Sequence, residues 1–226
     1  MNILGIETSC SVCSVGFVDE RGRTTERNII DPHIHSEKLL TLAEEVMKQA
    51  ETDFKSLDAI AVSIGPGSFT GLRIGLSTAK GLCYSLGRSL IAVSSFEVVA
   101  HVAHQSKPGF KRIVVAVDAR QGEFYVGSVD WRTNSESTAM EVRISPVEDL
   151  PWPGSADDST LWVTDGSGVA RDHGVQPDAI CEYASFCRGD AVALRARSNF
   201  ERNEIADLAS IEPLYLKNFV VKTAAS

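Results

Sequence analysis

Residues 65–75 read Gly-Pro-Gly-Ser-Phe-Thr-Gly-Leu-Arg-Ile-Gly, and this stretch is more informative about the fold than any other part of the chain. A strand-like apolar run precedes it at 57–64, and a helical pattern follows over 71–87. Glycine allows positive φ and close backbone approach, and the start of a helix presents unpaired N–H groups. The stretch therefore predicts a strand–turn–helix unit that either holds an anion or admits another piece of backbone.

The glycine spacing excludes the two best-known phosphate loops. A Walker A loop would place Lys and then Ser or Thr after its last glycine, whereas Gly71 is followed by Leu72 and Arg73. The Rossmann fingerprint is excluded because the spacing here is G-x-G-x-x-x-G. On the residues alone, a plain strand–turn–helix connection and a phosphate cradle both remain open.

The composition is that of a globular protein. Of the 226 residues, 43% are apolar and 23% are charged, so the chain can bury a sizeable core as one large domain or two small ones. It contains no run of about 18 apolar residues and begins on a strand-like pattern without a charged leader. We expect a cytoplasmic protein that does not bind membranes.

The charge balance argues against unaided nucleic-acid binding. Twenty-two basic and thirty acidic residues give a net charge of −8, whereas nucleic-acid binding needs a basic surface that displaces counterions. We interpret the short basic groupings (Arg195 with Arg197, and the arginines at 21, 23 and 27) as solvated surface. Any nucleic acid would then be handled mainly by a partner.

The five cysteines, at 10, 13, 83, 181 and 187, are predicted to be reduced and structural. Cys10 and Cys13 have C-x-x-C spacing, but they lie in a strand-like stretch, where residues three apart point to opposite faces. They should neither pair nor share a metal ion, and no metal site is predicted.

The first half predicts a mixed sheet with helices packed on it. Ser36 is the expected N-cap of the first helix. Lys107-Pro108-Gly109 marks a boundary between a first lobe at 1–106 and a smaller one at 107–226, whose last helix or tail is a candidate to return to the first lobe. The expected elements of the first lobe are strands at 2–8, 11–18, 24–30, 57–64 and 90–94 and helices at 37–51, 71–87 and 95–105.

The second half is less regular. Its strand–turn–strand opening at 112–131 echoes that at 2–18, which suggests two related lobes of which the second is cut short. The expected elements are strands at 112–118, 123–131, 139–145 and 160–165, a loop at 151–159 and a helix at 189–199.

Six segments resemble signatures of the bacterial TsaB (YeaZ) family. They follow the family's order from residue 3 to residue 216, so the resemblance covers essentially the whole chain, and the glycine stretch is highly specific. The segments are ILGIETS at 3–9, HSEKLL at 35–40, GPGSFTGLRIG at 65–75, AKGL at 79–82, DARQGEFY at 118–125 and PLYL at 213–216.

The resemblance implies an α/β protein with the actin-like, Hsp70-like (ribonuclease H-like) ATPase fold. Two lobes with mixed β-sheets flanked by helices are expected, the second lobe being reduced. The resemblance also implies a role in forming N6-threonylcarbamoyladenosine in tRNA, at the adenosine 3′ of the anticodon. In that family TsaB is a non-catalytic partner and activator of TsaD, which carries the catalytic site. TsaE, an ATPase, joins the larger complex, and TsaC makes threonylcarbamoyl-adenylate.

The motifs of a catalytic actin-like protein look altered in this chain. Glu7-Thr8-Ser9 stands where such an ATPase has an Asp near the Mg-nucleotide phosphate, and Asp118 is followed by Ala119 and Arg120 instead of glycines. We expect no catalytic residue and no cofactor bound by the chain alone, with ATP at the level of the complex left open. The residues of a possible vestigial nucleotide site are Glu7, Thr8, Ser9, Asp118 and Arg120.

The metal pair of the catalytic relative, His-x-x-x-His, falls on Ser95 and Val99, and a valine cannot ligate a metal. The other histidines considered are interpreted as surface or boundary residues: His33, His35, His101 and His104.

The family's pairing surface, for TsaD or for a second TsaB chain, is formed by the two helices at 37–51 and 71–87. Gly71 and Gly75 share a helix face, and glycine in a helix costs about 1 kcal/mol relative to alanine, so we expect a second helix to approach closely there. Such an interface would bury on the order of 1,600 Å². We also expect Gly75→Leu to fold but to pair less well. The candidate interface residues are Leu39, Leu40, Ala43, Gly71, Leu72, Arg73, Gly75, Leu76 and Ala79.

Some alternatives remain open. Both helices could simply cover their own sheet. Arg73 lies in a helical first turn, where a cation is unfavourable, which points to a carboxylate across the interface or to solvent exposure. The chain could also be a small ATPase or kinase that uses Glu7, Thr8 and Asp118 around Mg-ATP. A peptidase is the weaker alternative, because no Ser-His-Asp, Cys-His or H-E-x-x-H arrangement is legible. Homodimer formation in isolation and tRNA contact by Lys217 and Lys222 are open as well.

Overall fold

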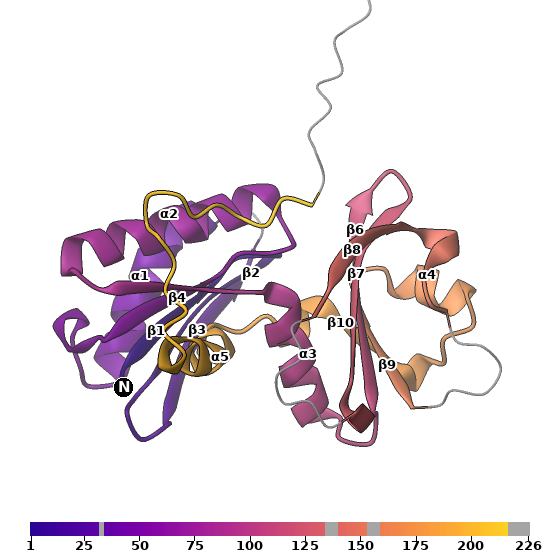
Figure 1. Ribbon diagram of the computed structural model, residues 1–226, viewed down its shortest axis with the longest axis horizontal. Helices are drawn as coiled ribbons and strands as arrows, with labels where there is room; N and C mark the ends of the chain where they lie inside the picture. Colours follow the sequence, from indigo (N-terminus) through magenta and orange to yellow (C-terminus); the bar gives the residue numbers. More distant parts are fainter. Residues whose placement is uncertain (32–33, 134–139, 153–158, 217–226) are drawn as a thin grey trace, which may run out of the picture.

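The computed structural model describes residues 1–31, 34–133, 140–152 and 159–216, which form two lobes (Figure 1). The first lobe is built on a five-stranded sheet of order β3-β2-β1-β4-β5. Its first three strands form an antiparallel meander, and β1, β4 and β5 run parallel to one another. The strands are β1 (Ile3–Glu7), β2 (Val12–Val18), β3 (Thr24–Ile30), β4 (Ala59–Ser63) and β5 (Ser89–Val93).

The second lobe repeats this connectivity. Its sheet has the order β10-β9-β6-β7-β8, with an antiparallel meander from β6 to β8 and parallel pairing of β6, β9 and β10. The two-lobed α/β fold with mixed sheets is therefore confirmed, and the echo between the two halves corresponds to β1–β2 and β6–β7. The strands are β6 (Arg112–Arg120), β7 (Glu123–Asp130), β8 (Val142–Pro146), β9 (Thr160–Thr164) and β10 (Ile180–Glu182).

Helices cover both faces of the first sheet because its inner strands β1, β2 and β4 are buried on both sides, whereas the edge strand β3 is largely exposed. Leu4 and Ile6 on β1 pack with α1 (His35–Gln49) and α2 (Phe69–Leu86), whereas Ile3 packs on the opposite face with residues of α5 (Gly189–Glu201). Figure 1 shows α2 and α5 on opposite sides of the sheet.

Helix α5 is contributed by the chain after it has completed the second lobe. An ideal Cβ on Gly5 or Gly16 would collide with backbone atoms at the start of α5, so these two glycines let the helix lie directly on β1 and β2. The amide of Gly189 donates to Ser14 Oγ at 2.9 Å. Beyond the helix, the chain stays on the first lobe, where Ala206 N donates to Leu90 O at 2.9 Å.

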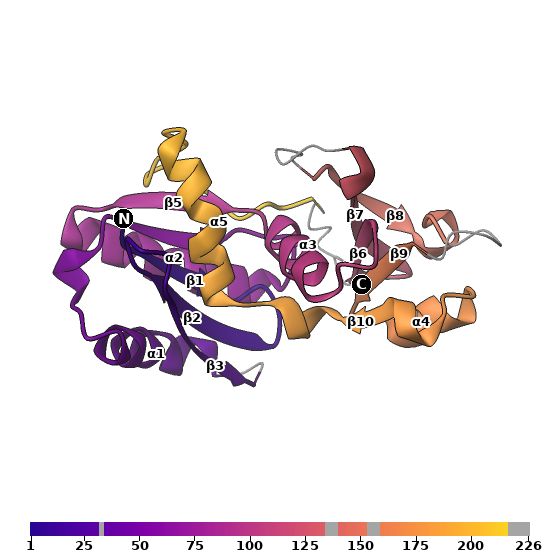
Figure 2. The same cartoon turned by 90° about the horizontal axis from the view of Figure 1, so that it is seen from below.

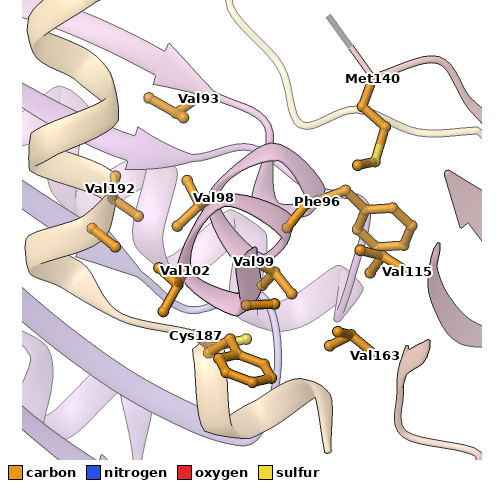
Figure 3. Packing of buried hydrophobic residues seen from close by; sticks show 14 of the residues in the cluster. Val93, Phe96, Val98, Val99, Val102, Val115, Met140, Val163, Cys187 and Val192 are labelled. Carbon is orange, nitrogen blue, oxygen red and sulfur yellow. The ribbon is translucent and has the colours of Figure 1, made fainter. Parts of the chain in front are cut away.

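Helix α3 (Ser95–Ser106) stands between the lobes, as Figures 1 and 2 show from two directions. One buried cluster runs from the first sheet and α5 through α3 to the second sheet, so the two lobes share a core. Glu97 on α3 is also paired with Arg195 on α5 at 3.0 Å. Figure 3 shows part of this cluster, including Val98, Val99 and Val102 of α3, Val192 of α5, and Val115 and Val163 of the second sheet.

Two sequence-based expectations about the first helix are wrong. Ser36 is not its N-cap, because α1 begins at His35 and Ile34 occupies the cap position without a side-chain hydrogen bond. His35 is not a surface residue either: it is buried, and its Nε2 lies 3.1 Å from Cys10 O and 3.2 Å from Val12 O. This tertiary anchor starts the helix earlier than the local capping signal. His33 lies outside the described residues.

In the second lobe the sequence reading missed β10 and the short helix α4 (Ser167–Asp172). Both are too short to show a clear period, and Asp165-Gly166-Ser167-Gly168 resembles a turn. Among the described residues, no helix has the length and apolar character needed to cross a membrane.

Candidate functional site

The glycine stretch admits the chain's own β1–β2 turn. A Cβ on Gly67 would collide with Ser9 O, and one on Gly71 would collide with Thr8 O. Ser68 N donates to the same Ser9 oxygen at 2.6 Å. Of the two uses open to such a turn, the structure therefore shows the close approach of a backbone.

The start of α2 is capped from within the stretch. Ser68 is the N-cap, and its side chain accepts from Gly71 N at 3.2 Å, while its carbonyl accepts from Leu72 N at 2.9 Å. Several amides that would otherwise face an anion are thus already paired. Further along the helix, a Cβ on Gly75 would collide with Thr8 Oγ1.

Glu7 ends β1 underneath this turn. Its side chain is fully buried, and Oε1 accepts from Ser9 N at 2.6 Å. Burial raises the pKa of the Glu7 carboxyl, because a charged carboxylate loses its hydration there. Thr8 is buried as well, so neither side chain is exposed to solvent.

The positions of the relative's histidine pair are occupied by structural residues. Ser95 is buried, and its Oγ accepts from Gly65 N at 3.1 Å, which ties α3 to the glycine stretch. Val99 lies in the core between the lobes. His101 is exposed, and His104 is half-buried and stacks on Trp131 at 4.2 Å. Within the described parts of the chain, no group of three or more His, Cys, Asp or Glu residues is placed to hold a metal ion.

A cleft of about 700 Å³ lies between the lobes, and the β1–β2 turn forms part of its lining. Ser9, Asp118 and Arg120 line it together, whereas Glu7 and Thr8 do not. The first lobe also contributes Cys10, Ser68, Phe69 and Leu72; the second contributes Val117, Tyr125 and Asp165.

Two carboxylates face the cleft from the second lobe. The Asp118 carboxylate accepts from Arg120 N at 2.7 Å and from its guanidinium at 3.3 Å. Asp118 N donates to the carboxylate of Asp165 at 2.9 Å, which brings the two acidic residues together. The sequence analysis did not identify Asp165 as a candidate site residue. Its position at the start of the Asp-Gly-Ser-Gly turn that follows β9 could have pointed to it.

Arg73 has a partner within the chain. Its Nε donates to Tyr215 Oη at 2.8 Å, and its guanidinium lies 3.7 Å from the centre of the Phe69 ring. The Phe69 and Tyr215 rings are 5.4 Å apart, and Leu214 N donates to Ile64 O at 2.8 Å. The returning segment is thereby fixed at the edge of the cleft. Arg73 is exposed, which was one of its two expected environments, and within the chain it contacts an aromatic pair.

Most of the expected interface residues are instead buried inside the lobe, which corrects that expectation. Only Leu40 and Arg73 are exposed. Periodicity shows that a helix face is apolar or small, but not whether the same chain covers it. The seven buried residues are Leu39, Ala43, Gly71, Leu72, Gly75, Leu76 and Ala79.

A different face of the two helices is open. Arg73, Ser77, Gly81 and Tyr84 recur at helical spacing along exposed α2, and Tyr84 is 87% exposed. On α1, Leu40 is 54% exposed. We refer to these five residues as the outer α1–α2 surface. Nothing in the described part of the chain lies within 4 Å of an ideal Cβ on Gly81.

Cys13 lies in β2 as expected, but Cys10 lies in the turn before that strand and not in the strand itself. Cys13 is buried in the cluster beneath α1 and α2, while Cys10 packs toward the opposite face and lines the cleft. All five thiols are free.

Comparison with known proteins gives the family. A family model described as "TsaD: tRNA N6-adenosine threonylcarbamoyltransferase" matches residues 31–225. The tRNA threonylcarbamoyladenosine biosynthesis protein TsaB of Buchnera aphidicola subsp. Schizaphis graminum is 32% identical over 152 residues, 65% of this chain and 71% of that protein. The chain belongs to the TsaB family. The TsaB of Escherichia coli (strain K12) is 28% identical over 228 residues, 97% of this chain and 96% of that protein.

Solved structures agree with the TsaB family assignment. YeaZ from Pseudomonas aeruginosa superimposes with a TM-score of 0.82 at 27% identity, covering 95% of this chain and 99% of that one. A tRNA N6-adenosine threonylcarbamoyltransferase of Erythrobacter litoralis (strain HTCC2594) is 33% identical, but the match covers only 42% of this chain and 32% of that enzyme. The likeness to that transferase is thus confined to part of both chains.

Proposed function

We propose that this TsaB-family chain is a non-catalytic partner and activator of a TsaD-type protein in forming N6-threonylcarbamoyladenosine in tRNA. Its relatives are named for that biosynthesis. The observation that carries the non-catalytic part is the filled glycine stretch: Thr8 and Ser9 occupy the space against Gly67 and Gly71, and Glu7 is buried beneath them.

The charge of the cleft supports the same proposal. A phosphate group entering it would meet the carboxylates of Asp118 and Asp165, and the guanidinium of Arg120 is already engaged by Asp118. Like charges brought together in a partly enclosed site repel. These residues do not fit a nucleotide phosphate, so we propose that the chain alone binds no nucleotide.

We propose that the TsaD-type partner docks on the outer α1–α2 surface, and that a second copy of the chain uses the same surface in isolation. Leu40 and Tyr84 offer exposed apolar area, while Ser77 and Gly81 let another helix come close. Helices pack at 8–10 Å between axes, the shorter separations requiring small residues at the contact. The guanidinium of Arg73 is held in place by Tyr215 and Phe69 at one end of this surface.

The test reconstitutes tRNA modification from separate purified proteins. The chain is mixed with the TsaD-type protein of its own organism, the mass of the complex is measured by light scattering, and modified tRNA is quantified with and without the chain. We expect a heteromeric complex, modification that depends on the chain, and no modification by the chain alone. Modification by this chain without a TsaD-type protein would refute the non-catalytic role.

The ATPase hypothesis is tested separately by calorimetric titration of the isolated chain with Mg-ATP. We expect no binding at ligand concentrations up to about 1 mM, a range that covers typical enzyme affinities for substrate. Saturable binding that Asp118→Asn abolishes would favour an independent ATPase or kinase.

A further inference from the structure

Two of the five cysteines, Cys10 and Cys187, meet beside the cleft. Cys10 belongs to the β1–β2 turn, lines the cleft, and accepts from Val12 N at 3.4 Å through its sulfur. Cys187 follows the 3-10 turn η5 (Tyr183–Phe186), in the segment that carries the chain from the second lobe into α5. Figure 3 shows Cys187 in the buried cluster between the lobes, and Cys10 packs against the same cluster.

Tyr183 connects the turn to this segment. Its hydroxyl lies 3.4 Å from Ser9 Oγ, and its carbonyl oxygen accepts from Cys187 Sγ at 3.4 Å. Burial raises the pKa of the Cys187 thiol well above its usual range, and a hydrogen bond between the side chains of Cys187 and Cys10 raises it further. The two thiols are therefore in contact, and Cys187 keeps its proton at neutral pH.

The two thiols differ in how a small reagent reaches them. Cys10 is half-buried and faces the cleft, whereas Cys187 is 2% exposed. An oxidant that enters the cleft therefore meets Cys10 first, with Cys187 behind it. An accessible cysteine beside a second thiol is the usual arrangement of a redox-sensitive pair. The other cysteines lie elsewhere: Cys13 and Cys83 in the cluster beneath α1 and α2, and Cys181 on β10.

We propose that Cys10 and Cys187 form a redox modification site, which hydrogen peroxide converts into a disulfide within the chain. Cys10, reacting as its thiolate, attacks one peroxide oxygen; the O–O bond breaks, and the hydroxide that leaves takes up the former thiol proton, giving Cys10 sulfenic acid and water. The Cys187 sulfur then attacks the Cys10 sulfur, the S–O bond breaks, and hydroxide leaves with the Cys187 proton as a second water. The two sulfurs lose two electrons, which the two peroxide oxygens gain.

The disulfide would tie the cleft wall to the segment between the lobes. Ser9, next to Cys10, lies against the glycine stretch, and the chain after Cys187 enters α5, which lies on β1 and β2. A cross-link between residues so far apart in the sequence restricts the unfolded chain and stabilises the fold. It also removes the Cys10 thiol from the cleft. The inference does not depend on the proposed function.

The first experiment uses the full native chain. The reduced protein is treated with hydrogen peroxide, the remaining thiols are alkylated, and the peptides are mapped by mass spectrometry without reduction. We expect Cys10 linked to Cys187 of the same chain as the main product at every protein concentration, and loss of the link on addition of dithiothreitol. The proposal is overturned if Cys10 stays a thiol, is oxidised without a link to Cys187, or is joined to another cysteine or to a second chain.

A second experiment separates the two chemical steps. In Cys187→Ala the sulfenic acid at Cys10 meets no second thiol, so its labelling by dimedone, which traps sulfenic acids, should rise at least about fivefold over the native chain. Cys181→Ala is the matched control, because Cys181 is also half-buried, and it should label as the native chain does. Equal labelling in Cys187→Ala and the native chain would overturn the proposal.

A third measurement needs no variant. The Tm of the oxidised native chain is compared with that of the reduced chain by circular dichroism. We expect the oxidised chain to unfold about 3 °C higher or more, because the bond fits the folded contact and constrains only the unfolded state. An equal or lower Tm would show that the disulfide forms only by distorting the fold, and would overturn the proposal.

Discussion

Replacing Gly81 should separate the stability of the chain from its pairing. The residue lies on exposed α2, and no described atom is within 4 Å of an ideal Cβ there, so a side chain meets no obstacle inside the chain. Glycine within a helix costs about 1 kcal/mol relative to alanine, and glutamine is nearly as good a helix former as alanine. Gly81→Gln should therefore raise the free energy of unfolding by about 0.5–1 kcal/mol, or the Tm by about 1–4 °C.

The same change should weaken docking on the outer α1–α2 surface. A glutamine side chain would hold a closely packed partner helix away from α2, and we expect the Kd to rise at least about tenfold, which corresponds to about 1.4 kcal/mol. Affinity for the TsaD-type protein is measured by calorimetry and unfolding by circular dichroism in urea. Gly168 offers a matched control, because it also has open space around its Cβ but lies in the second lobe. Native affinity in Gly81→Gln would refute the assignment of the surface, and a loss of stability would refute the argument from open space.

Gly75→Leu should behave differently from Gly81→Gln. The sequence led us to expect that Gly75→Leu would fold and only pair less well, whereas the structure predicts that it loses stability. Any side chain at this position would collide with Thr8 Oγ1 inside the lobe. Overpacking of a core typically costs 1–3 kcal/mol, so we expect a loss of stability of roughly 3 kcal/mol. Weaker pairing of this variant would then report unfolding, whereas in Gly81→Gln it would report a blocked surface.

Three further changes probe the remaining contacts. Burial raises the pKa of the Glu7 carboxyl above its ordinary 4.5, so the folded chain loses stability as the pH rises from 4.5 through the folded pKa. Glu7→Gln has no proton to lose, and its free energy of unfolding should increase relative to that of the native chain over this pH range. A difference in urea unfolding between the two chains that stays constant with pH would contradict this. Glu97→Gln removes the partly buried ion pair with Arg195 that joins α3 to α5 and should cost about 1–2 kcal/mol in urea unfolding, with no measurable loss being the contrary result. Tyr215→Phe removes the acceptor for Arg73 Nε and should speed hydrogen exchange of the Leu214 amide, which is bonded to Ile64; unchanged exchange would show that ring stacking alone holds the segment.

Much of the fold could be predicted because it follows from local patterns. Apolar alternation marked the strands, helical spacing marked α1, α2, α3 and α5, and the glycine stretch marked the turn between β4 and α2. The elements that were missed, α4 and β10, are short and carry no periodic signal.

The sequence by itself determined the two lobes, the order of their longer elements and the family. Only the tertiary structure decided what lies against each functional residue: Thr8 and Ser9 against the glycines, Asp165 beside Asp118, and Tyr215 on Arg73. Each of these contacts joins residues far apart in the chain. A local pattern shows which face of an element is apolar, small or charged, but the partner of that face is set by how the whole chain closes on itself. For this reason the same two glycines, Gly71 and Gly75, suggested a binding surface in the sequence and were found in the interior of the fold.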